Sequence, residues 1–125
     1  MEMDYLKNAT AMLSQEHYVI AKSKAPVHGA FANIIAKDEV TVIIDEQKAS
    51  KDFLAADVGW RLISLNVETP LDAIGIKARI AGALAQAGVA IMPISAYSRD
   101  HFLIKERDLA AAKTALARIG ISLKS

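Results

Sequence analysis

The alternation of apolar and polar positions is clearest in the second half of the chain. Residues 60–67 (WRLISLNV) are rich in aromatic, leucine and β-branched side chains, which predicts a strand. Residues 76–87 place their larger apolar side chains on one helical face and are followed by Gly88, so we expect a helix there. Between these elements, residues 68–75 contain a proline and end on a glycine, which favours a turn.

Shorter elements are expected in the rest of this half. They are a strand at 89–97, a turn at 98–100, a strand at 101–105, a helix at 107–119 and a strand at 121–123. The order β-α-β-β-α-β is the ferredoxin-like arrangement, in which the strands lie in the sheet order 4-1-3-2. Pro93 lies inside the second strand and has no backbone N–H, so that strand is expected at a sheet edge.

The first half of the chain has a less regular pattern. We expect a helix at 4–13, a strand at 17–21, a hairpin of 31–36 with 40–44, and a helix at 45–56 that ends near Gly59. Residues 42–59 and 103–120 then share one order of elements: a strand end, charged residues, a helix and a glycine. Two interpretations stay open, a degenerate tandem repeat or coincidence, because this order of elements is common.

Composition and charge narrow the class of protein. The chain has 125 residues, enough for one domain or two half-size units, and its apolar runs stop short of the ~18–20 residues that a membrane helix needs. The N-terminus has two acids before its first lysine, unlike a signal peptide, so we expect a cytoplasmic protein without membrane contact. With 15 basic and 14 acidic residues, the chain has no basic excess that would favour nucleic acid.

Catalytic and metal chemistry find little support. The chain has no cysteine, and its three histidines lack the spacing of metal ligands, so we expect no metal and no cofactor. Ser95, Ser98, Asp100 and His101 are near one another in sequence, but a triad is defined by geometry and no G-x-S-x-G motif is present. An acylphosphatase-like hydrolase would need an arginine in the 68–75 loop, which is acidic instead.

A family resemblance rests on the runs WRLISL, LDAIGI, ALAQAGVAI, ISAYSRDHFLI and AAAKTAL, and on the spacing of Gly75, Gly88 and Asp100. Over 60–119 the sequence resembles the ACT domain. It is most similar to small stand-alone bacterial proteins with two ACT-like halves, which in turn are similar to the ACT modules of cellular arginine sensors. The resemblance implies an α+β, ferredoxin-like βαββαβ sandwich, with a degenerate ACT-like half at 1–58 and an ACT domain at 59–125.

The resemblance also implies a function. ACT domains bind small ligands, most often amino acids, in a regulatory role, and usually pair side by side. We therefore expect a sensor rather than an enzyme, with a homodimer as its assembly. The alternative is a structural module that pairs ACT-like sheets without any ligand.

The expected ligand residues are Asp72, Ala73, Ile74 and Gly75 in the loop after the first strand, and Asp100. If a helix starts after Gly75, its free backbone N–H groups suit a carboxylate. The pattern alone prefers a capping box at Thr69 with the helix starting at Pro70, whereas the resemblance favours the later start. Asp100 either bonds the backbone of its own turn or receives the ammonium or basic side chain of an amino acid.

Overall fold

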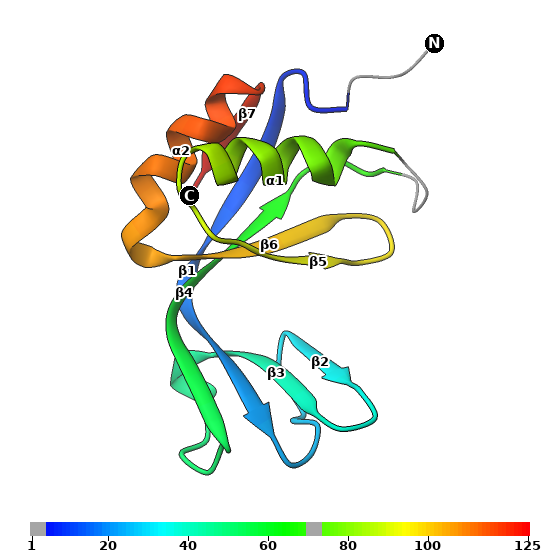
Figure 1. Ribbon diagram of the computed structural model, residues 1–125, viewed down its shortest axis with the longest axis vertical. Coiled ribbons are helices and arrows are strands. Elements are labelled where there is room, and N and C mark those ends of the chain that lie inside the picture. The colour runs from blue at the N-terminus through cyan, green and yellow to red at the C-terminus, as the bar shows by residue number, and fades with distance from the viewer. Residues whose placement is uncertain (1–4, 70–73) are drawn as a thin grey trace. The chain divides into compact units, whose positions relative to one another are not determined.

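The computed structural model describes residues 5–69 and 74–125, which belong to two compact units (Figure 1). The larger unit comprises the residues up to Gln15 together with Leu62–Ser125, and the smaller unit is Glu16–Arg61. The elements are β1 (Ala9–Ser23), β2 (Ala32–Ile35), β3 (Val40–Asp45), η1 (Glu46–Lys48), β4 (Ala55–Leu65), α1 (Ile76–Gln86), β5 (Met92–Ser95), β6 (Asp100–Lys105), η2 (Glu106–Asp108), α2 (Leu109–Arg118) and β7 (Ile121–Lys124).

The larger unit has the predicted β-α-β-β-α-β order, from β4 through β7. Both of its helices lie on one side of its sheet (Figure 1). Buried side chains of the two helices meet those of β4 and β6 in one apolar core, because each element presents its apolar residues at its own period. They include Ile76, Ile80 and Leu84 of α1, Ala112 and Leu116 of α2, Ile63 and Leu65 of β4, and Phe102 and Ile104 of β6.

The predicted sheet order 4-1-3-2 is wrong at one position. In the larger unit the strands follow the order β7-β1-β4-β6-β5, so β1 lies between the first and last strands of the βαββαβ unit. Ala9–Met12 pairs with β7 in parallel, from Ala9 opposite Ile121 to Met12 opposite Lys124. The other end of the sheet is as predicted, because β5 pairs only with β6 in the sheet path and carries Pro93 at the edge.

The start of α1 decides between the two sequence interpretations. Gly75 is the N-cap of α1, with φ 88° and ψ −11°, a left-handed conformation that no helix interior contains. The helix therefore begins at Ile76, as the resemblance predicted. The capping box proposed at Thr69 and Pro70 involves residues 70–73, which lie outside the described residues.

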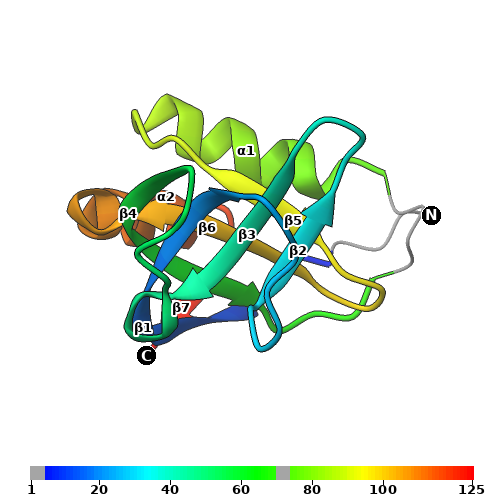
Figure 2. The same ribbon diagram turned by 90° about the horizontal axis from the view of Figure 1, so that it is seen from below.

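The smaller unit is built around a β-hairpin, as predicted. Strands β2 and β3 are antiparallel, and the N–H of Ala36 donates to the carbonyl of Glu39 at 2.9 Å across their turn. β3 pairs in turn with the second part of β1, with Tyr18 opposite Asp45 (Figure 2). Its own small core contains Val19, Ala21, Val42 and Ile44.

The helix predicted at 4–13 is wrong. Residue 4 lies outside the described residues, and from Ala9 the chain is strand β1, which continues to Ser23. Alanine, methionine and leucine in this segment have high helix propensity, but propensity is overridden by the pairing of Ala9–Met12 with β7. Alternate residues Ala9 and Ala11 are buried, which is the period of a strand.

The helix predicted at 45–56 is also wrong. Only Glu46–Lys48 form a short 3-10 turn, and β4 starts at Ala55. The carboxylate of Asp45 accepts a hydrogen bond from the N–H of Gln47 at 2.9 Å, and the hydroxyl of Ser50 accepts one from the N–H of Asp52 at 3.0 Å. Such local side-chain bonds satisfy the backbone without a helix.

The two hairpins nevertheless match each other closely. β5 and β6 have the same lengths as β2 and β3 and lie 60 positions later, and a 3-10 turn follows each hairpin. The N–H of Ala96 donates to the carbonyl of Arg99 at 3.0 Å, as the N–H of Ala36 does to Glu39. The correspondence ends there, because α2 follows in the larger unit whereas β4 follows in the smaller one.

Candidate functional site

The loop that follows β4 is held at its first described end by the β5–β6 turn. The N–H of Thr69 donates a hydrogen bond to the carbonyl of Ser98 at 3.2 Å. Beside it, Nη2 of Arg99 lies 3.6 Å from Oε1 of Glu68. These contacts bring the predicted ligand loop to the turn that immediately precedes Asp100.

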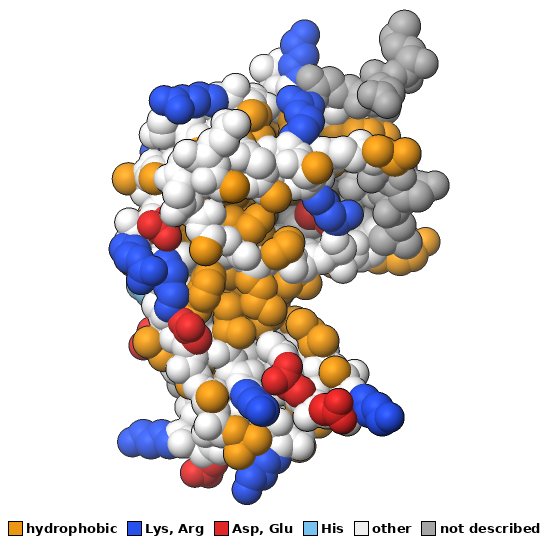
Figure 3. Space-filling view, viewed as in Figure 1, with side chains coloured by type: hydrophobic (Ala, Val, Ile, Leu, Met, Phe, Trp, Pro, Cys, Tyr) orange, Lys and Arg blue, Asp and Glu red, His pale blue; other side chains and the backbone are white. Residues whose placement is uncertain are grey.

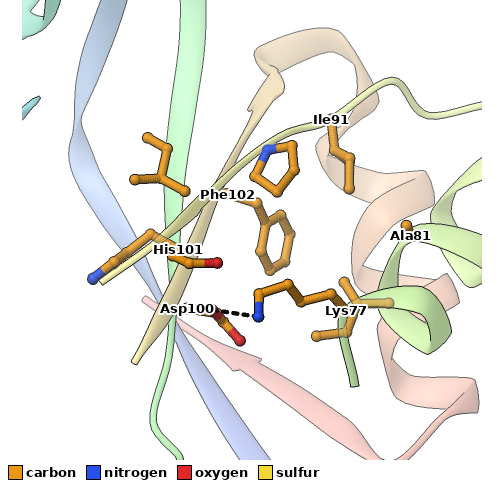
Figure 4. A pocket seen from close by; sticks show the side chains of 10 residues that line it. Lys77, Ala81, Ile91, Asp100, His101 and Phe102 are labelled. Atoms are coloured by element: carbon orange, nitrogen blue, oxygen red, sulfur yellow. Dashed lines mark ion pairs between the residues drawn. The ribbon is translucent and has the colours of Figure 1, made fainter. Parts of the chain in front are cut away.

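The other described end of the loop leads to the same place. Gly75 opens α1, and two residues later Nζ of Lys77 lies 3.8 Å from Oδ1 of Asp100 (Figure 4). The side chain of Asp100 is 13% exposed, whereas that of Lys77 is 50% exposed. At this distance and exposure the ion pair is loose, and exposed pairs of this kind contribute only about 0–1 kcal/mol to stability.

The first turn of α1 offers backbone donors. Its N-cap residue, Gly75, has no side chain that could cap it, and the first turn contains no acidic residue. The N–H of Arg79 donates to the carbonyl of Gly75 at 3.0 Å, which leaves the N–H groups before it without a partner inside the helix. Among the described residues, none beyond its two chain neighbours has an atom within 4 Å of the position that a Cβ at Gly75 would take, so a small molecule has space to approach the backbone from their side.

The predicted site residues gather at one end of α1 as far as the structure describes them. Ile74 is 93% exposed, Gly75 is the N-cap of α1, and Asp72 and Ala73 lie outside the described residues. Asp100 is the first residue of β6, opposite Ser95, so the turn predicted at 98–100 lies earlier, at 96–99. Gly75 and Asp100 are therefore brought to the same end of α1, with Lys77 linking them.

A pocket of about 80 Å³ lies between α1 and the β5–β6 hairpin (Figure 4). The ion pair of Lys77 and Asp100 stands at its border. Most of the wall is apolar and consists of Ile80, Ala81, Ile91, Pro93, Ile94 and Phe102. In the space-filling view, apolar side chains are visible over the region of α1 and the β5–β6 hairpin, with charged side chains beside some of them (Figure 3).

The sequence did not identify Lys77 or this apolar wall. The signal for Lys77 was its place two residues after Gly75, in the first turn of the predicted helix and off its apolar face. The wall has no local signal, because it joins residues of three elements that only the sheet order brings together.

His101 lies next to Asp100 in sequence but on the other face of β6, as predicted (Figure 4). Its Nδ1 is hydrogen-bonded to Oγ of Ser64 at 2.7 Å. Burial lowers the pKa of His101, and the cation of Arg99 lowers it further, while the nearby carboxylate of Asp100 raises it to a smaller extent than burial lowers it.

Neither a metal site nor a membrane-spanning helix is found within residues 5–69 and 74–125. No group of three or more histidine, aspartate or glutamate side chains there is arranged to hold a metal ion. None of the described helices is long and apolar enough to cross a membrane.

The fold and the sequence together define the class of protein. The sequence profile of the ACT domain matches residues 56–118, about half of the chain. The chain therefore belongs to the ACT domain family, whose members are regulatory, non-catalytic modules. None of the curated proteins matches it significantly in sequence.

Solved structures support the same fold. A crystal structure of an Agobacterium tumefaciens protein is 24% identical, with a TM-score of 0.81, over 94% of this chain and 92% of that one. A Vibrio cholerae protein of unknown function is 21% identical, with a TM-score of 0.76, over 93% of both chains. The ligand-free regulatory subunit of aspartate kinase from Thermus thermophilus is 13% identical, with a TM-score of 0.68, over 91% of this chain and 97% of that one. At these identities the likeness establishes the fold alone.

Proposed function

We propose that this protein is a cytoplasmic, non-catalytic sensor that binds a small ligand, an amino acid, and acts as a homodimer in a regulatory role. Membership of the ACT family supports the regulatory part of the proposal. The fold shared with an aspartate kinase regulatory subunit supports it as well. The amino acid and the homodimer are expectations that this class of domain favours, and the cytoplasmic location is an expectation from the sequence.

The observation that carries the proposal is the attachment of the loop at both described ends to one hairpin. Thr69 is bonded to Ser98 before the loop, and Lys77 faces Asp100 after it. The ligand carboxylate meets the first N–H groups of α1, which have no partner inside the helix, and the positive dipole end of that helix, next to Gly75. The ammonium group of the ligand meets Asp100.

The proposed ligand residues remain Asp72, Ala73, Ile74, Gly75 and Asp100. We also propose that 1–58 and 59–125 are two ACT-like halves, the first one degenerate. The 60-position offset between the two hairpins supports this part, since strand lengths and turn bonds repeat at that interval.

A thermal-shift screen against the twenty amino acids tests the binding function. A ligand present at a hundred times its dissociation constant stabilises the fold by about 2.7 kcal/mol, which shifts the melting temperature measurably. If no amino acid shifts it while the protein is still a dimer, the chain is an assembly module instead.

Substitution of Asp100 by asparagine tests the ammonium contact by calorimetry with the amino acid found in the screen. Loss of a charge-assisted hydrogen bond costs about 1.5–3 kcal/mol, so affinity is expected to fall roughly ten- to a hundredfold. Asp38→Asn, at an exposed aspartate in the β2–β3 turn, is the matched control and is expected to bind like the parent. Equal binding by Asp100→Asn would contradict the contact.

A further inference from the structure

The pocket between α1 and the β5–β6 hairpin combines an apolar interior with a pair of opposite charges at its border. Ile80 and Phe102, 4% and 3% exposed, close its inner wall. At its border an ammonium and a carboxylate face each other at 3.8 Å, from Lys77 and Asp100. An occupant that matches both needs an apolar group and two groups of opposite charge that lie close together, as on the α-carbon of an amino acid.

The ion pair between Lys77 and Asp100 is loose enough for each side chain to bind a ligand group instead. Their separation of 3.8 Å is longer than a hydrogen bond between nitrogen and oxygen, and half of the Lys77 side chain is exposed. A zwitterion placed at the border gives each of them a new partner of the correct sign. Its carboxylate binds Lys77, the second residue of α1, and its ammonium binds Asp100.

The size and polarity of the interior restrict the side chain that such a zwitterion can carry. The pocket is small, with a volume of about 80 Å³, and most of its lining is apolar. This suits a side chain of three or four carbon or sulfur atoms. A basic side chain does not suit it, because Asp100 is the one carboxylate among the described residues that line the pocket.

We propose that this pocket binds an apolar α-amino acid of about the size of leucine, isoleucine, valine or methionine, with its side chain between α1 and β5. The inference rests on the proposed function and deepens it, because it names the class of ligand and adds Lys77 as the residue that selects for a free carboxylate. Ala81 sets the size limit, since it is the small residue of α1 on the pocket wall.

The first experiment measures binding of L-leucine, leucinamide and N-acetyl-leucine to the unmodified protein by calorimetry. Leucinamide lacks the carboxylate and N-acetyl-leucine lacks the ammonium, so each is expected to bind at least tenfold more weakly than leucine. In Lys77→Gln the difference between leucine and leucinamide is expected to disappear. In Asp100→Asn the difference between leucine and N-acetyl-leucine is expected to disappear.

The second experiment fills the pocket. Ala81→Leu places additional carbon atoms in the interior and is expected to weaken leucine binding at least tenfold. Ala85→Leu makes the same change on an exposed position of the same helix and is expected to bind leucine like the parent. Circular dichroism and thermal melting test whether both variants fold. If Ala81→Leu does not fold, the comparison of leucine with its two derivatives tests the proposal by itself.

The outcomes separate this inference from the proposed function. Binding of leucine, isoleucine, valine or methionine that is lost on filling the pocket supports both. Binding confined to basic, acidic or other polar amino acids overturns the apolar-ligand inference and leaves the sensor function standing. A lack of binding by all twenty amino acids overturns both.

Discussion

The hydroxyl of Ser64 lies at hydrogen-bond distance, 2.7 Å, from Nδ1 of His101, and so joins β4 to β6. Both side chains lie on the sheet face opposite the helices, since their neighbours Ile63 and Phe102 are in the helix-covered core. Burial is the main cause of the lowered pKa of His101, so the folded protein holds this histidine in its neutral form near pH 7.

Stability is therefore expected to fall in mildly acidic solution. The unfolded chain binds a proton on this histidine at a pKa of about 6.5, whereas the folded chain binds it only at a lower pH. The histidine has no effect on stability well above pH 6.5, and it destabilises the fold progressively as the pH falls below that value. Urea unfolding at several pH values between 5 and 8 measures the effect.

Two variants isolate the contribution of His101 from that of the acids. His101→Gln is expected to show a smaller loss of stability between pH 7.5 and 5.5 than the parent. His28→Gln, at an exposed histidine, is expected to lose as much as the parent does. The interpretation fails if His101→Gln retains the full pH dependence.

The fold is expected to need a glycine at position 75 because of its backbone conformation and not because a side chain would clash there. A Cβ there meets no atom within 4 Å, but φ is 88°, so Gly75→Ala should cost about 1–2 kcal/mol. Gly82→Ala, in the middle of the same helix and with equally open space, should instead stabilise the fold by up to about 1 kcal/mol. Chemical denaturation of both variants gives the comparison, and equal effects would contradict it.

The bulkier change Gly75→Val addresses the ligand. We expect it to abolish amino-acid binding, because a branched side chain would occupy the approach to the first turn of α1. Calorimetry with the amino acid found by thermal shift is the measurement. Normal affinity in this variant would exclude close approach to Gly75.

Gly120 is expected to tolerate substitution less well than Gly75. Its φ is 96°, and in addition a Cβ would lie 2.8 Å from the carbonyl oxygen of Leu6. Gly120→Ala should therefore lose more stability than Gly75→Ala, by more than about 2 kcal/mol in total. Denaturation midpoints measured side by side test the ranking, which is wrong if the two variants are equally stable.

The assembly is expected to be a homodimer. ACT domains typically oligomerise, and two-fold dimers are the commonest symmetric assemblies. Size-exclusion chromatography with light scattering at micromolar concentration should give twice the chain mass of 13.4 kDa. A monomer at that concentration would contradict the prediction.

The helices and the edge strand of the second half could be predicted from the sequence because their signals are local. Apolar spacing along α1 and α2 and the glycines after them mark both helices, and each helix buries the face that the spacing indicates. Pro93 identified the edge strand for an equally local reason, the missing N–H.

In the first half, the predicted helices are wrong because partners distant in sequence decide the structure. Residues 9–13 and 45–56 both have helix-forming composition, yet the former pairs as a strand and the latter buries no helical face. The site shows the same limit. The sequence identifies Gly75 and Asp100 individually. The contact of Lys77 with Asp100 depends instead on how β6 lies relative to α1, which no local pattern indicates.

The parallel pairing of β1 with β7 sets an order of events during synthesis of the chain. Ile121 is the partner of Ala9, so 112 further residues must be synthesised before that side of the first strand can be covered. Loop closure over such a separation is entropically costly and makes folding slow. On the ribosome, the β2–β3 hairpin can form as soon as it emerges, whereas this part of β1 remains an uncovered strand edge, open to aggregation, until β7 is released.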